Sequence, residues 1–177
     1  QKEISDWLTF EIKDFVAYIS PSREEIEIRN KTISTIREAV KQLWPDADLH
    51  VFGSYSTDLY LPGSDIDCVV TSKLGGKESR NNLYSLASHL KKKNLATEVE
   101  VVAKARVPII KFVEPHSGIH IDVSFERTNG IEAAKLIREW LDDTPGLREL
   151  VLIVKQFLHA RRLNNVHTGG LGGFSII

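Results

Sequence analysis

Residues 65–70, with the sequence DIDCVV, begin with alternating acidic and apolar side chains and end in two valines. Successive side chains of a β-strand point to opposite faces, so Asp65, Asp67 and Val69 share one face. Ile66, Cys68 and Val70 share the opposite face, which we expect to be buried. The chain must therefore build a sheet that covers one face and presents two carboxylates on the other.

A second apolar segment with an embedded carboxylate lies at residues 119–125, IHIDVSF. It follows the turn sequence PHSG and another apolar run at 107–114, which predicts an antiparallel hairpin. Within this strand Asp122 lies among apolar neighbours, where an unpaired charge is costly. Two interpretations stay open: Asp122 is a metal ligand, or it forms an ion pair with a basic residue such as Lys104 or Arg106.

Taken together, Asp65, Asp67 and Asp122 are typical of a metal site. Carboxylates without a nearby cysteine suit Mg²⁺ or Mn²⁺, and two such ions activate a hydroxyl and stabilise a leaving pyrophosphate. An Asp-x-Asp pair alone is common at solvated strand ends. The additional carboxylate in an apolar strand favours the functional interpretation.

The remaining pattern predicts helices and strands arranged as an α+β fold. Ser22, followed three residues later by Glu25, is the signature of a helix N-terminus. We expect helices at 4–19, 23–43, 83–93, 131–141 and 147–162, and strands at 49–52, 65–70, 98–103, 107–114 and 119–125.

Length and charge limit the class of protein. The 177 residues fit one domain or one domain with part of another, and the net charge of −1 is unlike that of a self-sufficient nucleic-acid binder. The single cysteine, Cys68, excludes an internal disulfide and favours an intracellular reducing compartment. We expect no membrane segment and no membrane partner, because no apolar run is long enough to span a bilayer.

Three short motifs occur in a familiar order: FGS at 52–54, DID at 65–67 and IDV at 121–123. Together they resemble the signature of the DNA-polymerase-beta-like nucleotidyltransferase superfamily. Residues 51–70, 120–137 and 151–164 more narrowly resemble the nuclear poly(A) polymerases of TRAMP RNA-surveillance complexes. The resemblance extends through most of the chain and is most specific at 51–70.

The resemblance implies a fold and a domain organisation. Residues 22–136 would form the nucleotidyltransferase catalytic domain, with a mixed or antiparallel central sheet and flanking helices. Residues 1–21 would supply an N-terminal helix to a helical central domain, and residues 137–177 would form the start of that domain.

The resemblance also implies roles for the carboxylates and for a turn. Asp65 and Asp67 match the paired metal ligands, and Asp122 matches the third ligand, which helps to deprotonate the primer 3′-hydroxyl. Gly53 and Ser54 match a turn that faces the nucleotide triphosphate.

Further nucleotide contacts are implied on the carboxyl-terminal side. Asn129 and Gly130 match positions near the sugar, and Lys155 matches a basic residue that reaches the triphosphate. A lysine that merely extends its stem along the helix to solvent is the alternative for Lys155. Gly173 and Phe174 stand where relatives carry Ser-Tyr, and Phe174 retains the ability to stack on a base.

The implied activity is a template-independent poly(A) RNA polymerase that adds AMP from ATP to RNA 3′ ends with two Mg²⁺ or Mn²⁺ ions. It would act in the nucleus, mark RNAs for processing or decay, and work with a zinc-knuckle RNA-binding protein and an RNA helicase. In relatives, the segment that selects the base corresponds to sequence beyond Ile177. Two alternatives stay open: a terminal uridylyltransferase with the same three aspartates, and a non-catalytic RNA-processing scaffold.

Overall fold

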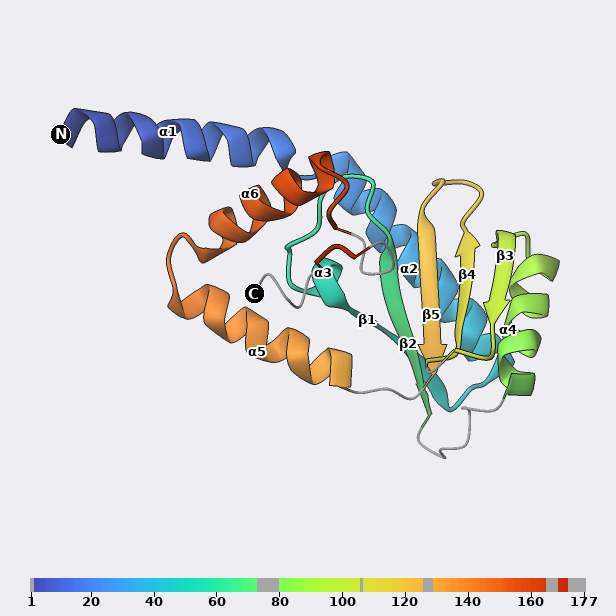
Figure 1. The fold of residues 1–177 in the computed structure, drawn as a ribbon. Helices are drawn as coiled ribbons and strands as arrows, with labels where there is room; N and C mark the ends of the chain where they lie inside the picture. Colours follow the sequence, from blue (N-terminus) through green and yellow to red (C-terminus); the bar gives the residue numbers. More distant parts are fainter. Residues whose placement is uncertain (1, 73–79, 106, 126–128, 165–168, 172–177) are drawn as a thin grey trace.

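The computed structural model describes residues 2–72, 80–105, 107–125, 129–164 and 169–171. Helices and strands are interspersed along these residues, with helices at both ends of the chain and the strands between them (Figure 1). The elements are α1 (Lys2–Ile19), α2 (Arg23–Leu43), β1 (Ala47–Phe52), α3 (Gly53–Ser56), β2 (Ile66–Ser72), α4 (Arg80–Lys92), β3 (Thr97–Val102), β4 (Ile109–Val113), β5 (His120–Phe125), α5 (Asn129–Asp143) and α6 (Leu147–Ala160).

Within the described residues, five strands form one sheet in the order β1-β2-β5-β4-β3. β2 and β5 are parallel, and the other neighbouring pairs are antiparallel. The expected α+β fold with a mixed sheet is therefore confirmed. The predicted hairpin is also confirmed, because β4 and β5 pair around the turn at residues 114–119.

Helices α2 and α4 pack against one face of this sheet and bury its apolar side chains. Figure 1 shows α2 passing behind the strands and α4 beside β3. The fully buried members include Ile36, Leu49, Ile66, Leu86 and Ile110. At about 25 cal/mol per Å² of buried apolar surface, this contact is the main source of stability for the sheet.

The amino-terminal boundary of α2 follows directly from its sequence. Ser22 adopts an extended backbone, and its hydroxyl accepts a hydrogen bond from the amide of Glu25. This contact satisfies one of the amide groups that a helix start leaves without a partner. The predicted helix start is confirmed, whereas the carboxylate of Glu25 points to other partners.

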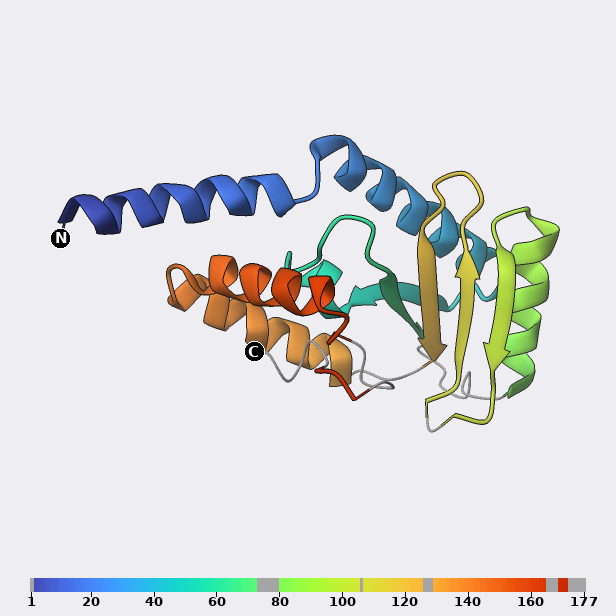
Figure 2. The same ribbon diagram turned by 45° about the horizontal axis from the view of Figure 1, so that its top comes forward.

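A second hydrophobic cluster among the described residues joins α1, α5 and α6 to the segment after α3. Its buried members are Val16, Ile19, Leu59, Ile137, Val151 and Leu152. Figure 2 shows α1 extending beyond the rest of the chain, and its outer half exposes Ile4, Trp7 and Phe10. The domain boundaries expected at residues 21 and 136 stay a prediction.

One expectation for β2 is wrong. Val69 was expected to share an open face with the two aspartates, but it is fully buried, as are Val70 and Ile66. The sheet is covered on both sides at this point, and β2 is partly exposed only near its two ends, at Asp67 and at Thr71 and Ser72. Within the part of the chain that the structure describes, every helix is too short or too polar to cross a lipid bilayer.

Candidate active site

Asp67 and Asp122 are neighbours across the parallel strands β2 and β5, whose register pairs their Cα atoms. Because side chains at paired positions point to the same face of a sheet, the two carboxylates stand side by side. Asp65 comes one residue before β2 and is exposed. Its negative charge raises the pKa of Asp67, so all three predicted aspartates contribute to one electrostatic site.

The surroundings of Asp67 are unfavourable for the charged form of its carboxyl group. Burial, followed by the charges of Asp122 and Asp65, raises its pKa from the ordinary value of 3.8 to about 6. The positive charges of Lys111 and Lys155 act in the opposite direction but do not offset the increase. Near neutral pH, the structure thus holds a partly buried carboxylate in surroundings that favour a cation.

Asp122 has a partner on the neighbouring strand β4. The ammonium group of Lys111 donates a hydrogen bond to Asp122 Oδ2 over 2.6 Å, and this bond raises the pKa of Lys111. The ion pair that was expected as an alternative role for Asp122 therefore exists. Its partner is Lys111, which occupies the paired position across the hairpin. Lys104 was named as one example of a basic partner and is not the one that the structure shows, and Arg106 lies outside the described residues.

Lys111 is a member of the site that the sequence analysis missed, although the sequence holds the signal for it. In an antiparallel hairpin, paired residue numbers have a constant sum. Centring the hairpin on the turn PHSG pairs residue 111 with residue 122, as β4 and β5 show. Counting outwards from the turn would have identified the partner of Asp122.

Gly53 lies directly against Asp67, at the junction of β1 and α3. Its φ of +68° belongs to the left-handed region, which favours glycine. A Cβ atom at this position would lie 3.0 Å from Asp67 Oδ2. Glycine is thus required both by the turn and by the close approach of the carboxylate.

A cavity of about 960 Å³ opens beside Asp67. Gly53, Ser54 and Ser64 line it on the side of the sheet, and Lys155 lines it from α6. The volume is in the range of small-molecule and cofactor sites. The structure thus brings the predicted turn, one predicted metal ligand and the predicted lysine to the same space.

Lys155 is not a lysine that extends to solvent. Its ammonium group donates a hydrogen bond over 2.5 Å to the carbonyl oxygen of Leu59, a buried residue between α3 and β2. Burial lowers the pKa of Lys155, and the charge of Asp67 opposes this effect. The lysine is therefore directed towards the cavity and the carboxylates.

The other predicted nucleotide contacts are less fully described. Asn129 and Gly130 begin α5, which follows the strand of Asp122 in the chain, and their side chains are outside the described part of the structure. Gly173 and Phe174 lie outside the described residues. The roles expected for these four positions stay predictions.

The carboxylate oxygens of these aspartates are chemically suited to bind a divalent cation. Among the described residues, no three Asp, Glu, His or Cys side chains are gathered closely enough to form a complete ion-binding cluster. Burial, followed by the negative charges of Asp122 and Asp65, nevertheless raises the pKa of Asp67, and the nearby lysines do not offset this increase. Carboxylate oxygens in such an environment are ligands that Mg²⁺ and Mn²⁺ prefer.

Comparison with known proteins accounts for this arrangement. Residues 8–142 match the family described as "Poly(A) RNA polymerase, mitochondrial-like, central palm domain". This match covers the whole sheet and the three aspartates. The chain belongs to this palm-domain family. The nucleotidyltransferase resemblance predicted from the FGS, DID and IDV motifs is confirmed.

Individual relatives of this palm-domain chain are very similar to it. Poly(A) RNA polymerase protein 2 of Saccharomyces cerevisiae is 99% identical over all 177 residues, which make up 30% of that protein. A solved structure of the polymerase core of TRAMP, an RNA-surveillance complex, is 98% identical with a TM-score of 0.85, over 99% of this chain and 55% of that one. The palm-domain chain thus spans less than a third of this curated relative.

The palm fold also occurs in an enzyme described with another nucleotide. The crystal structure of the Cid1 poly(U) polymerase matches with a TM-score of 0.80 at 23% identity, over 94% of this chain and 50% of that one. At this identity the likeness concerns the fold alone. The palm fold by itself therefore does not distinguish adenylyl from uridylyl transfer.

Proposed function

We propose that this chain is the catalytic part of a template-independent poly(A) RNA polymerase, which adds AMP from ATP to RNA 3′ ends. The observation that carries the proposal is the pairing of Asp67 and Asp122 beside a cavity lined by Gly53, Ser54 and Lys155. Membership of the palm-domain family and the name of the 99% identical relative support the same activity.

The aspartates would hold the divalent cations that the family implies. Asp65, Asp67 and Asp122 supply oxygen ligands, and bound Mg²⁺ or Mn²⁺ would neutralise charge that develops on the phosphate oxygens. Positioning and charge neutralisation account for most of the catalysis in phosphoryl transfer. The structure supports this role through the crowding of negative charge around Asp67.

The transfer itself breaks one bond and forms another. The oxygen of the RNA 3′-hydroxyl attacks the α-phosphorus of ATP, and the bond from that phosphorus to the bridging oxygen of pyrophosphate breaks. Asp122 accepts the hydroxyl proton, and pyrophosphate leaves with the bonding electron pair. Gly53 and Ser54 would face the triphosphate, and Lys155 lines the same cavity.

The remaining expectations are part of the same proposal. Residues 22–136 form the catalytic domain, and residues 1–21 and 137–177 belong to a helical central domain. The protein acts in the nucleus on RNA 3′ ends, together with a zinc-knuckle RNA-binding protein and an RNA helicase. The near-neutral charge supports a need for an RNA-binding partner.

Two other functions share part of this support. A uridylyltransferase would use the same fold and the same aspartates. A scaffold would have the same fold but would catalyse no reaction. The charge crowding at Asp67 disfavours the scaffold, because a protein without chemistry gains nothing from a destabilising cluster of carboxylates.

The test uses the protein at the full length of its relatives, with an RNA primer, Mg²⁺ and each nucleoside triphosphate in turn. We expect extension with ATP, and loss of extension in the Asp65→Ala/Asp67→Ala protein. Equal extension with UTP would replace the adenylyl assignment by a broader nucleotidyl one. Extension that persists in the doubly substituted protein would overturn the proposed chemistry.

A further inference from the structure

Asp65 is held in a different way from the other two aspartates. Asp67 and Asp122 belong to the ladder between β2 and β5, whose first pair is Ile66 with Ile121. Asp65 precedes that pair, so the sheet does not fix its backbone. Its position depends on the segment that enters β2, residues 61–65.

Two residues on α2 fasten this entry segment. Arg29 Nη2 donates a hydrogen bond over 2.6 Å to the carbonyl oxygen of Ser64, which directly precedes Asp65. Glu25 Oε1 accepts a hydrogen bond over 3.0 Å from the amide of Gly63. Arg29 Nε also donates to Glu25 Oε1 over 3.0 Å, so the two side chains act as one unit.

The same guanidinium contacts the segment that contains the Gly53–Ser54 turn. Its Cζ atom lies 4.8 Å from the ring centroid of Tyr60 and 5.9 Å from that of Tyr55. The two rings pack against each other at 4.9 Å, and Tyr55 donates its hydroxyl proton to Asn30 on α2. Arg29 thus links α2 to both segments that border the cavity.

Stability alone does not account for an arginine at this position. Arg29 is 1% exposed, and among the described residues its Nη1 atom has no hydrogen-bond partner, as is also the case for the nearby Ser64 Oγ. Burying a charged group with an unsatisfied donor is costly, and apolar replacements of buried ion pairs are often neutral or stabilising. A residue retained at such a cost calls for a role beyond packing.

We propose that Arg29, with Glu25, is a positioning residue that fixes the backbone at Gly63 and Ser64 and so places Asp65 beside Asp67 for cation binding. The inference rests on the proposed function, since it concerns the same carboxylates. Arginine suits the role because its planar group donates in two directions at once, here to Glu25 and to Ser64.

The test replaces Arg29 by lysine. Lysine keeps the positive charge but lacks the planar guanidinium group that donates to both Glu25 and Ser64. Mn²⁺ is titrated while thermal unfolding is recorded, which reports cation binding without activity. We expect the Mn²⁺ concentration for half-maximal stabilisation to rise about tenfold, as for other residues that orient metal ligands. In RNA extension, kcat should fall with little change in the KM for ATP.

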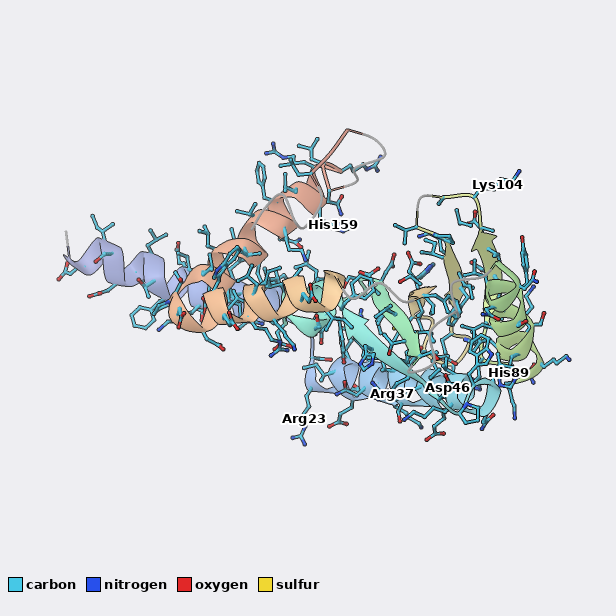
Figure 3. All side chains as sticks on the ribbon, turned by 90° about the horizontal axis from the view of Figure 1, so that it is seen from below. Arg23, Arg37, Asp46, His89, Lys104 and His159 are labelled. Atoms are coloured by element: carbon cyan, nitrogen blue, oxygen red, sulfur yellow. The ribbon has the colours of Figure 1, made fainter. Side chains whose placement is uncertain are left out.

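Three further variants separate positioning from packing. Arg37→Lys is the matched control, because Arg37 also lies on α2 (Figure 3) and its Nε donates to a backbone oxygen, that of Leu49, over 3.0 Å. Glu25→Ala should weaken Mn²⁺ binding, whereas Glu25→Gln, which keeps the acceptor, should stay near the wild type. Glu25 is partly exposed, so these variants remain informative if Arg29→Lys fails to fold.

The possible outcomes distinguish failure of the positioning role from failure of the proposed function. A lowered melting temperature with unchanged Mn²⁺ half-saturation in both Arg29→Lys and Glu25→Ala would overturn the positioning role. If the wild type is stabilised by Mn²⁺ but extends no RNA, the proposed function fails while the Mn²⁺ titrations still decide the role of Arg29. A wild type with neither response would overturn both.

Discussion

Asp67 and Asp122 occupy paired positions on the parallel strands β2 and β5, so the sheet holds two carboxylates together against their mutual repulsion. Burial and the neighbouring charges of Asp122 and Asp65 raise the pKa of Asp67 to about 6. The sheet that stabilises the fold thus also maintains a locally unfavourable site.

The first prediction concerns the stability of Asp67→Asn without divalent cations. Because the pKa of Asp67 is raised on folding, its charge destabilises the fold progressively as the pH rises from about 3.8 to above 6. The difference between these values corresponds to about 3 kcal/mol. At pH 8 the substitution should therefore raise the free energy of urea unfolding by about 1–3 kcal/mol, with a smaller gain at pH 4.5. An equal or lower stability at pH 8 would contradict the electrostatic account.

A second prediction concerns Gly53→Ala. The added Cβ atom would lie 3.0 Å from Asp67 Oδ2, at a residue whose φ is +68°. Left-handed backbone costs about 1–2 kcal/mol for a residue with a side chain, and the carboxylate must also shift. We expect a loss of about 1–2 kcal/mol in unfolding free energy and a larger proportional loss of RNA extension. Gly118→Ala is the control, since Gly118, in the turn between β4 and β5, shares a positive φ but has open space around it.

Lys111→Met tests the ion pair with Asp122. Removing the ammonium group should raise the pKa of Asp67 further, because the charge of Lys111 lowers it in the wild type. A carboxyl-detected NMR titration of the cation-free protein measures this shift directly. The stability loss at pH 7 should stay near 1 kcal/mol, since Lys111 is partly exposed. Lys104→Met, in the connection between β3 and β4 (Figure 3), should leave the titration unchanged.

Glu114→Gln tests the turn that sets the hairpin register. The buried carboxylate accepts hydrogen bonds from the amides of His116 and Ser117 and from the Ser117 hydroxyl. Burial raises the pKa of Glu114, but the bonds from Ser117 and His116 more than offset it, so the pKa is lowered. Its stabilisation is therefore present above pH 4.5 and is lost as the pH falls through the lowered value.

At pH 7 the Glu114→Gln substitution should lower the unfolding free energy by about 1–3 kcal/mol, since a buried acceptor of several bonds is lost. The loss should shrink as the pH falls below 4. Glu38→Gln, on the exposed side of α2, serves as the reference for removing a carboxylate. Equal stability of the two variants at pH 7 would show that the turn contributes little.

Local patterns were sufficient to predict most elements of the fold. The start of α2 at Ser22 and the hairpin around PHSG depend on neighbours in the chain, and both are confirmed. The parallel pairing of Asp67 with Asp122 joins two residues that lie more than fifty positions apart in the chain. Periodicity places each carboxylate on a face but does not determine which strands become neighbours.

Arg29 illustrates a signal that was present but not used. It lies on the apolar stripe of α2, three residues after Ile26 and four before Ile33. A charged residue on such a stripe predicts a buried partner. Its contact with Ser64 depends on the tertiary fold, so the sequence indicated that a partner exists but not which one.

The most direct test of the central claim combines two measurements on Asp67→Asn, made at the full length of the relatives. One records extension of an RNA primer with ATP and Mg²⁺, and the other records urea unfolding at pH 8 without divalent cations. We expect extension to fall at least about a hundredfold while the unfolding free energy rises. Extension at the wild-type rate by a folded Asp67→Asn protein would contradict the claim that this destabilising carboxylate is retained for catalysis.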